Sequence, residues 1–509
     1  MEVSQFLLVF LLVPVLTVVA RDVTEGRIVV DGNTPVAKTD ENYVCMTLDV
    51  WPFNECPQTP CVWDGNASML VLNLSLPTLT KAVEAFGTLR IRLGGTLQDK
   101  LIYDVGSFKG RCHPFERSNR SLFLITEGCL YMERWDELNW FFNKTGAIVT
   151  FGLNAILGRN NTIGKQWEGD WNYSNAEALI QYTIEKNYQI NSWEFGNELG
   201  GYNSIGASIT AAQYAKAPGA FFDASWYEDF VNETGPNVID VLTHHVYNMG
   251  AGNDTEIIHK FLDPSYLSRE SSTFQKLENV VQNHAPWIVA WVGEAGGAYG
   301  GGSPYVSNTF VDGFWYIDQL GMAALYNTKV YCRQTLVGGH YGILRPETLT
   351  PSPDYYGALL FHRLMGRGVL KVDNNVSSYL RAYAHCSRER TGITVLFINM
   401  SNQTDFIIEI ENHTNVSLAK KMSRIRQISK GGSIASELGA QREEYHLTPS
   451  NGLLKSPTVL LNGKVLEATE EGDLPNLTPV YRQSNSSISI ATWSISFVVV
   501  PNFVAPCCK

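Results

Sequence analysis

The chain has 509 residues, of which 44% are apolar and 17% are charged, so it is globular and too long for one ordinary domain. Its net charge of −11 is spread without a basic block, which argues against nucleic acid, or a polyanion bound through a Lys/Arg stripe, as a partner. A large barrel with a smaller second domain suits this length.

The N-terminal residues predict export. An apolar run at residues 6–20 ends in Val18 and Ala20, which is typical of a cleaved signal peptide at residues 1–20. The stretch before the run contains Glu2 and lacks Lys and Arg, and a signal anchor is the alternative. We expect a secreted protein (extracellular or cell-wall), or a lysosomal or vacuolar one, with at most peripheral membrane association.

Sequons and cysteines also favour export. Fifteen N-x-[ST] sequons are predicted glycosylation sites: Asn66, Asn73, Asn119, Asn143, Asn160, Asn172, Asn232, Asn253, Asn375, Asn399, Asn402, Asn412, Asn415, Asn476 and Asn485. The nine cysteines lack the C-x-x-C spacing of a zinc site, so we expect disulfides and no metal. Because the count is odd, one thiol is left over, and Cys386 is expected to pair with Cys507 or Cys508.

Apolar strands alternate with amphipathic helices over residues 41–367. Strands are expected at residues 43–49, 88–95, 147–155, 192–198, 238–247, 286–295 and 329–339. Helices are expected at residues 78–86, 135–142, 174–184 and 310–320. Strands that are apolar on both faces and alternate with helices form parallel sheets, and at this length the pattern predicts a (β/α)8 TIM barrel.

Short β-rich runs separated by turns fill residues 368–509 and predict a C-terminal β-sandwich domain. The N-terminal segment at residues 21–40 contains an apolar strand, Val29–Val30, that is expected to pair with this domain.

One part of the predicted barrel is short. Between Glu198 and the strand at residue 238, the fold requires a helix, a strand and a second helix. Only a helical start at residues 209–216 and a helix at residues 224–231 are evident, and residues 217–223 are typical of a loop after a missing strand. Since a βα unit takes roughly 30 residues, the chain is expected to lack about one such unit.

Polar residues gather where the predicted strands end, which is the active face of a barrel. They are Asp49, Arg92, Thr96, Asn154, Asn197, Glu198, His244, His245, Tyr247, Glu294, Gln334, His340 and Tyr341. Glu198 and Glu294 each end a strand and follow a glycine closely. Glycoside hydrolysis requires two such carboxylates, one as acid and one as nucleophile or base. The alternative is that each glutamate is only a helix-cap acid or a surface charge. The presence of two similar glutamates, one of them beside Asn197, disfavours this alternative.

Other polar and aromatic residues have structural alternatives. Adjacent strand residues point to opposite faces, so one of His244 and His245 is expected to face away from the site. Arg92 is expected to be a structural cation that tunes the nucleophile, and loop packing is as good an account of His340 as substrate contact. Trp51, Trp171 and Tyr299 suit stacking on sugar rings, with core packing equally expected for Trp171.

The stretches WEFGNEL (residues 193–199), VGEAGGAYGGG (292–302) and CRQTLVGGHYGIL (332–344) resemble glycoside hydrolase family 79, the heparanase-like glycosidases of plants. The resemblance covers most of the chain and implies a retaining β-glucuronidase without a cofactor, with Glu198 as proton donor and Glu294 as nucleophile. It also implies substrate contacts from Asp49, Thr96, Asn197, His245, Tyr247, Gly300, Gly301, Gln334, Gly339 and Tyr341.

The resemblance supports the expectation that a segment is missing after Lys216, because family members carry more residues there. A splice variant would account for the missing segment. A catalytically impaired, glycan-binding isoform is therefore one alternative, and a hydrolase of the same clan acting on neutral sugars is another. The absence of basic clusters in the sequence disfavours heparan sulfate and favours a plant glycan bearing glucuronic acid or a small aromatic glucuronide.

Overall fold

The computed structural model describes residues 21–52, 62–63, 67–119, 121–162, 164–200, 206–211, 220–413 and 441–508, with only the backbone described at residues 220–221. The predicted signal peptide, the sequons at Asn66 and Asn415, and the cysteines Cys56 and Cys61 lie outside the described residues. So do residues 212–219, where the missing segment was expected.

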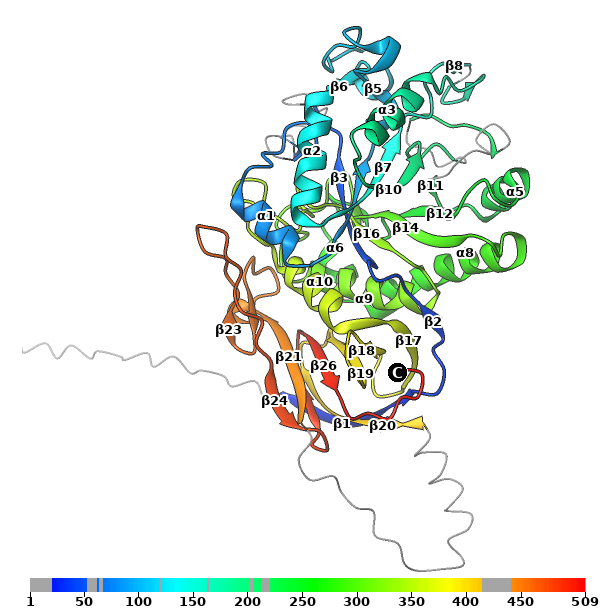
Figure 1. The fold of residues 1–509 in the computed structure, drawn as a ribbon. Helices are drawn as coiled ribbons and strands as arrows, with labels where there is room; N and C mark the ends of the chain where they lie inside the picture. The colour runs from blue at the N-terminus through cyan, green and yellow to red at the C-terminus, as the bar shows by residue number, and fades with distance from the viewer. Residues whose placement is uncertain are drawn as a thin grey trace, which may run out of the picture.

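A parallel sheet of eight strands forms the barrel (Figure 1). In spatial order its strands are β10 (Ile190–Phe195), β7 (Ile148–Leu153), β4 (Arg90–Gly94), β3 (Val44–Asp49), β16 (Tyr331–Arg333), β14 (Val289–Ala295), β12 (Val241–Val246) and β11 (Ala220–Phe221). The central strands are almost continuously buried because helices cover their outer faces.

In the described part of the chain, seven main helices follow the strands: α1 (Pro77–Glu84), α2 (Met132–Thr145), α3 (Ser174–Glu185), α5 (Ala224–Thr234), α8 (Ser271–His284), α9 (Asp312–Leu325) and α10 (Pro353–Leu364). The helices α9 and α10 are buried around nearly their whole circumference. They lie between the barrel strands and the C-terminal strands (Figure 1). Helices buried to this extent need cover on the side away from the barrel, and the second domain provides it.

The segment at residues 217–223, expected to be a loop, instead contains the two-residue strand β11. It pairs in parallel with β12, with Ala220 opposite His244 and Phe221 opposite His245. Within the described part of the chain, β10 pairs only with β7, and β11 only with β12. A strand this short carries no periodic apolar pattern, so it could not be predicted from the sequence.

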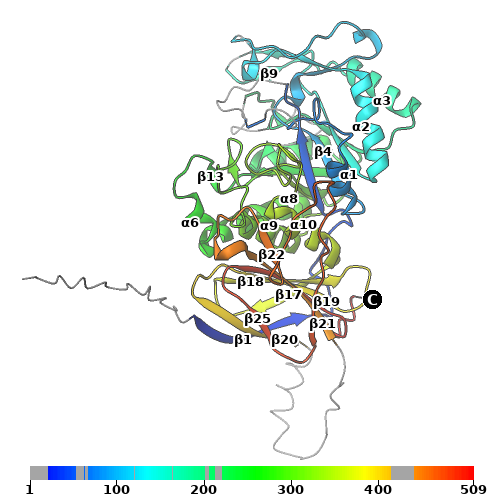
Figure 2. The ribbon, with the colours of Figure 1, turned by 90° about the vertical axis from the view of Figure 1, so that its left-hand side faces the viewer.

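The C-terminal domain contains β17 (Met365–Asn374), β18 (Leu380–Ser387), β19 (Ile393–Asn399), β20 (Thr404–Asn412), β21 (Gln441–Pro449), β22 (Val459–Leu461), β23 (Lys464–Val465), β24 (Val480–Gln483), β25 (Ile488–Ile490) and β26 (Ser494–Val500). From the N-terminal segment, β1 (Asp22–Asp31) pairs with β17 and β20, and β2 (Ala37–Lys38) pairs with β17. All of these strands belong to one twelve-stranded sheet, which folds over so that β1, β20 and β25 lie across from β18 and β19 (Figure 2). They enclose an apolar core that includes Ile28, Phe397, Phe406 and Ile490, which makes the domain a sandwich.

Three disulfides are present among the described cysteines: Cys45–Cys332 between β3 and β16, Cys112–Cys129, and Cys386–Cys508. The last of these ties the C-terminus to β18 and leaves Cys507 as a free thiol. Within the described residues, no helix combines the length and apolarity needed to cross a membrane.

Two predicted glycosylation sites are corrected by the structure. Asn399 is fully buried and its amide nitrogen donates to the carbonyls of Thr404, Ile490 and Ala491. Asn412 is 9% exposed and donates to the carbonyl of Val504. A glycan needs this same nitrogen and open space, so neither sequon is compatible with the folded packing.

Candidate active site

The C-terminal ends of the barrel strands bring most of the predicted site residues together. Those buried at the strand ends include Asp49 at the end of β3, Arg92 in β4, Asn197 and Glu198 after β10, His245 in β12, Glu294 in β14 and Gln334 after β16. Alternation along β12 sends His244 to the outer face, where its ring packs against Phe222 and Phe274. Tyr247, directly after β12, points back into the site.

Glu198 and Glu294 face each other across this site. An oxygen of the Glu198 carboxylate lies within 4.8 Å of an oxygen of the Glu294 carboxylate. Glu198 has a φ of +53°, a left-handed conformation that is uncommon for residues other than glycine. Backbone strain of this kind clusters at functional sites, where the surrounding structure holds it in place.

The Glu294 carboxylate is held as an anion. Arg92 donates Nη1–H to Oε2 at 2.7 Å, and the Tyr247 hydroxyl donates to Oε1 at 2.5 Å. Burial alone raises the pKa of Glu294, but the charges of His245 and Arg92 and these two hydrogen bonds outweigh it and lower the pKa below its ordinary value. An ionised, buried carboxylate is suited to nucleophilic attack.

Glu198 has a different partner. Nδ1 of His245 lies 2.8 Å from Oε1 of Glu198 and 4.0 Å from Oε2 of Glu294. Burial lowers the pKa of His245, but the charge of Glu294 and the contact with Glu198 outweigh burial and raise it. His245 is thus placed to exchange a proton with Glu198.

The loop that carries Glu198 is anchored by Asn197. Its side-chain oxygen accepts a hydrogen bond from Arg92 Nη2 at 2.9 Å, and its backbone N–H donates to Asp99 Oδ2 at 2.7 Å. Asp99 also accepts from the backbone of Ala155 at 2.8 Å. Burial raises the pKa of Asp99 to about 7, against the lowering effect of these two backbone hydrogen bonds.

A second carboxyl group, Asp49, lies beside the nucleophile. Gln334 donates Nε2–H to its Oδ2 at 2.9 Å, and Gln334 is itself hydrogen-bonded to Thr47. Burial, followed by the charge of Glu294, raises the pKa of Asp49 to about 7. Its other oxygen, Oδ1, has no hydrogen-bond partner among the described residues, which suits a polar group of a substrate.

The glycine-rich loop after β14 packs on Tyr341. The backbone N–H of His340 donates to the Gly301 carbonyl at 2.6 Å, and that of Gly339 donates to the Val62 carbonyl at 2.9 Å. Gly300, Gly301 and Gly339 have φ values of +80°, +89° and +59°, a region in which glycine is favoured. Burial lowers the pKa of His340.

The remaining predicted residues divide between rim and core. Thr96, after β4, is half-buried, and Tyr299 is 53% exposed on the loop after β14. Trp51 stacks on Trp63, whose ring also meets that of Tyr341. Trp171 donates to the carbonyl of Asn154 and packs its ring on Phe195, so it serves as packing at the edge of the core.

Three residues of the site were missed in the sequence: Trp63, Asp99 and Glu194. Glu194 accepts Nε–H of Arg92 at 2.6 Å and is buried in β10. Glu194 stands inside the stretch WEFGNEL, four residues before Glu198, and Asp99 lies five residues after Gly94. Charged residues inside apolar strands were the available signal, because a buried charge needs a partner.

Glu198, His245 and Glu294 are also close enough to share a metal ion. Arg92 already donates to Glu294, and His245 has a raised pKa, so the group carries its own cations. Divalent metals need deprotonated ligands. The charges therefore fit a site that works on protons better than one that holds a metal.

Comparison with known proteins identifies the family. A family model described as "Glycosyl hydrolase family 79, N-terminal domain" matches residues 25–217 and 216–321. The chain belongs to glycosyl hydrolase family 79. It is 50% identical to Heparanase-like protein 1 of Arabidopsis thaliana over 536 residues, covering 99% of this chain and 98% of that protein. It is 37% identical to baicalin-beta-D-glucuronidase of Scutellaria baicalensis, covering 94% and 92% of the two chains.

A solved structure supports the fold of this family 79 glycosidase. The 4-O-alpha-L-rhamnosyl-beta-D-glucuronidase of Fusarium oxysporum aligns with a TM-score of 0.60 over 93% of this chain and 100% of that one, at 15% sequence identity. At this identity the likeness establishes the barrel and the β-rich domain, and the site residues stand on their own geometry.

Proposed function

We propose that this family 79 glycosidase is a secreted, retaining β-glucuronidase that cleaves β-linked glucuronic acid from glycans or small glucuronides. The approach of the Glu198 and Glu294 carboxylate oxygens to within 4.8 Å carries the proposal. Retaining glycosidases hold their two carboxyl groups about 5–5.5 Å apart, whereas inverting enzymes hold them roughly 6.5–9.5 Å apart to admit a water molecule.

In the first step the Glu294 carboxylate attacks the anomeric carbon, and Glu198 gives its proton to the leaving oxygen as the glycosidic bond breaks. Arg92 and Tyr247 keep Glu294 ionised and hold its orientation. We expect Asn197, next to Glu198, to hold the 2-hydroxyl of the sugar, because hydrogen bonds to this hydroxyl strengthen in the transition state of such enzymes.

In the second step a water molecule attacks the anomeric carbon and Glu294 leaves as a carboxylate. Glu198, now ionised, takes the proton of that water. His245 lies 2.8 Å from Glu198, so a protonated His245 stabilises Glu198 in this ionised state. Both glutamates then return to their starting protonation states.

Glucuronic acid as the sugar is supported by two observations. The relatives include a baicalin-beta-D-glucuronidase and a hyaluronoglucuronidase from Hirudo nipponia. The left-handed glycines Gly300 and Gly301 also suit a backbone nest that offers N–H groups to a carboxylate. We expect the substrate to be a plant glycan bearing glucuronic acid or an aromatic glucuronide.

The direct experiment measures release of nitrophenol from 4-nitrophenyl β-D-glucuronide by the wild type and by Glu294→Gln, which should be inert. Proton NMR of the first turnovers should show the β-anomer of glucuronic acid. The α-anomer as first product would refute retention. Faster release from a nitrophenyl arabinofuranoside than from the glucuronide would instead favour a neutral-sugar hydrolase.

Export is part of the proposal and has separate support. The predicted signal peptide occupies residues 1–20, and the three disulfides are typical of oxidising compartments. Most described sequons, including Asn143, Asn232 and Asn375, are exposed. Release of enzyme into the medium, with endoglycosidase-sensitive mass, is the expected result; retention in the cytosol would contradict it.

A shortened, glycan-binding form is the second candidate, favoured by the family match. The match is split into two parts that meet at residues 216–217, the point where the segment was expected to be missing. Well-folded wild-type protein that binds glucuronides and hydrolyses none would support this candidate over the enzyme.

A further inference from the structure

Arg92 lies at the centre of a buried network of three acceptors. Its side chain is 1% exposed and donates Nε–H to Glu194 at 2.6 Å, Nη1–H to Glu294 at 2.7 Å and Nη2–H to Asn197 at 2.9 Å. Burial lowers the pKa of Arg92, but the charges of Glu194 and then Glu294 outweigh burial and raise it. One permanent cation therefore serves two carboxylates, only one of which reacts.

Glu194 is held in a confined place beneath the nucleophile. Its side chain is 5% exposed, and its Oε1 has no hydrogen-bond partner among the described residues. Gly293, just before Glu294, adjoins it: a Cβ at this glycine would lie 3.6 Å from Glu194 Oε1 and 3.1 Å from Thr243 Cβ. The tight contact is therefore with Thr243, and Glu194 lies at ordinary contact distance from this glycine. The buried charge of Glu194 is compensated by Arg92.

We propose that Glu194 is a positioning residue that acts as the counter-charge of Arg92 during the reaction. The inference rests on the proposed double displacement. When Glu294 forms the bond to the anomeric carbon, its carboxylate becomes an ester and loses its negative charge. Arg92 stays buried and charged, and an unpaired buried charge is strongly destabilising. Glu194 then remains as its anionic partner and stabilises the glycosyl-enzyme.

Glu194 also acts on the free enzyme. Its negative charge partly offsets the positive charge of Arg92, which also contacts Glu294. The pKa of Glu294 is therefore higher than it would be beside Arg92 alone. The titratable and charged groups that face Glu294 are Arg92 from β4, His245 and Tyr247 from β12 and the turn after it, Glu198 after β10, Asp49 from β3 and Tyr341. Glu194 affects Glu294 indirectly, because it pairs with Arg92, which contacts Glu294.

The kinetic test uses Glu194→Gln, which keeps the size and a hydrogen-bond acceptor but removes the charge. Loss of a charge-assisted hydrogen bond predicts a fall in kcat of about 10- to 100-fold. The acidic limb of kcat/KM should move to lower pH, because one negative charge near Glu294 is gone. Glu194→Asp retains the charge and should leave the acidic limb in place. An unchanged limb in Glu194→Gln would overturn the proposal.

A second test needs no activity. Glu294→Gln imitates the uncharged state of Glu294 in the glycosyl-enzyme, and Glu194 still pairs with Arg92. The double variant Glu194→Gln/Glu294→Gln leaves Arg92 without either carboxylate, so its Tm should fall by more than the sum of the two single changes. Additive shifts would overturn the proposal, and would do so whether or not the wild type hydrolyses glucuronides.

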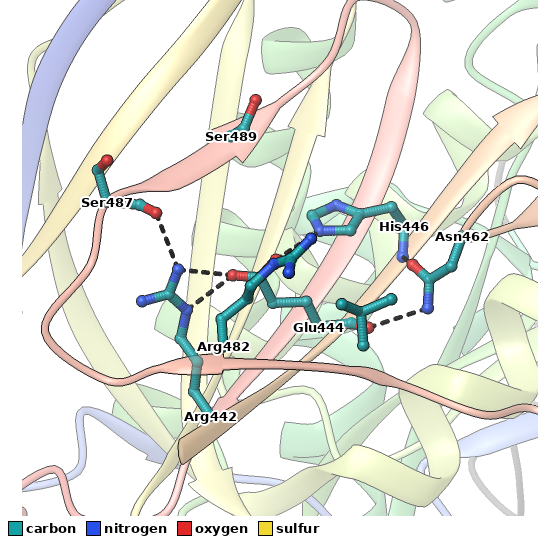
Figure 3. Close-up of a pocket in the computed structure, with 8 residues that line it drawn as sticks. Arg442, Glu444, His446, Asn462, Arg482, Ser487 and Ser489 are labelled. Atoms are coloured by element: carbon teal, nitrogen blue, oxygen red, sulfur yellow. Dashed lines mark hydrogen bonds and ion pairs between the residues drawn. The ribbon is translucent and has the colours of Figure 1, made fainter. Parts of the chain in front are cut away.

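The β domain offers a matched control. Arg442 donates to Glu444 at 2.7 Å in a polar pocket of about 350 Å³, and the two side chains are 2% and 7% exposed (Figure 3). Glu444→Gln removes the same kind of buried pair far along the chain from the active site. It should lower the Tm and leave the acidic limb unchanged. A matching limb shift in this control would show that the Glu194 effect is general destabilisation, which would overturn the proposal.

Discussion

The carboxyl group of Asp99 makes the stability of the protein depend on pH. Burial raises its pKa from 3.8 to about 7, so in the folded protein it stays protonated well above the pH at which the unfolded chain ionises. The folded state therefore binds more protons than the unfolded state between these values. The contribution of Asp99 to the free energy of unfolding is fully present below about pH 4, falls as the pH rises, and is lost above about pH 7.

The magnitude follows from the shift. A displacement of about three pKa units corresponds to roughly 4 kcal/mol of unfolding free energy. Asp99→Asn is neutral at every pH and should flatten the pH dependence by this amount, although it sacrifices one acceptor for the N–H of Asn197 or Ala155. That loss lowers stability at pH 5 by about 1–3 kcal/mol.

Urea denaturation from pH 4.5 to 8 measures both effects. Asp473→Asn, at an exposed carboxylate paired with Lys81, is the control and should leave the slope unchanged. Asp49 also has a raised pKa, so some slope should persist in Asp99→Asn. Parallel curves for the wild type and Asp99→Asn would refute the assignment of a protonated Asp99.

Three further predictions concern the site and its support. Tyr247→Phe removes a hydrogen bond that lowers the pKa of Glu294, so kcat should fall about 10- to 150-fold and the acidic limb of kcat/KM should move to higher pH. Gly300→Ala, at a φ of +80° with open space around it, should raise KM for a glucuronide and leave KM for the matching glucoside unchanged. Cys386→Ala opens a disulfide of sequence separation 122, which should cost about 4–5 kcal/mol in urea denaturation with kcat per folded molecule unchanged.

The sequence predicted the barrel because its strands are long apolar runs between amphipathic helices. The two glutamates were found because each ends such a strand, and a strand end is a definite place in this fold. The sequence did not predict β11, whose pairing with β12 depends on tertiary contact and not on local pattern.

The hydrogen-bond network behind the site was also hidden. Arg92 was expected to tune the nucleophile, and it does contact Glu294, but its contact with Glu194 joins residues 102 apart in sequence. Asp99 and Asn197 are likewise 98 apart. Such contacts form when neighbouring strands bring side chains together in the barrel interior. They cannot be predicted from the spacing of residues along the chain. The sequons at Asn399 and Asn412 failed for the same reason, because burial is a tertiary property.

The segment predicted to be missing after Lys216 concerns stability more than chemistry. The alignment with Heparanase-like protein 1 runs over 536 residues, more than the 509 of this chain, and the family match divides at residues 216–217. Yet β10 is registered by its pairing with β7, and the catalytic loop after it is held by Asp99, Arg92 and His245. These anchors come from β4, the turn after it and β12. We therefore expect the position of Glu198 to be independent of an additional strand between β10 and β11.

Inserting the corresponding segment of the Arabidopsis relative between residues 216 and 217 should therefore raise the Tm, since additional strand pairing protects the edges of β10 and β11. It should change kcat on 4-nitrophenyl β-D-glucuronide by less than about threefold, which is under 1 kcal/mol in activation free energy. A tenfold or larger rise in kcat would mean that closure of the barrel, and not the contacts of Asp99, Arg92 and His245, holds Glu198 opposite Glu294.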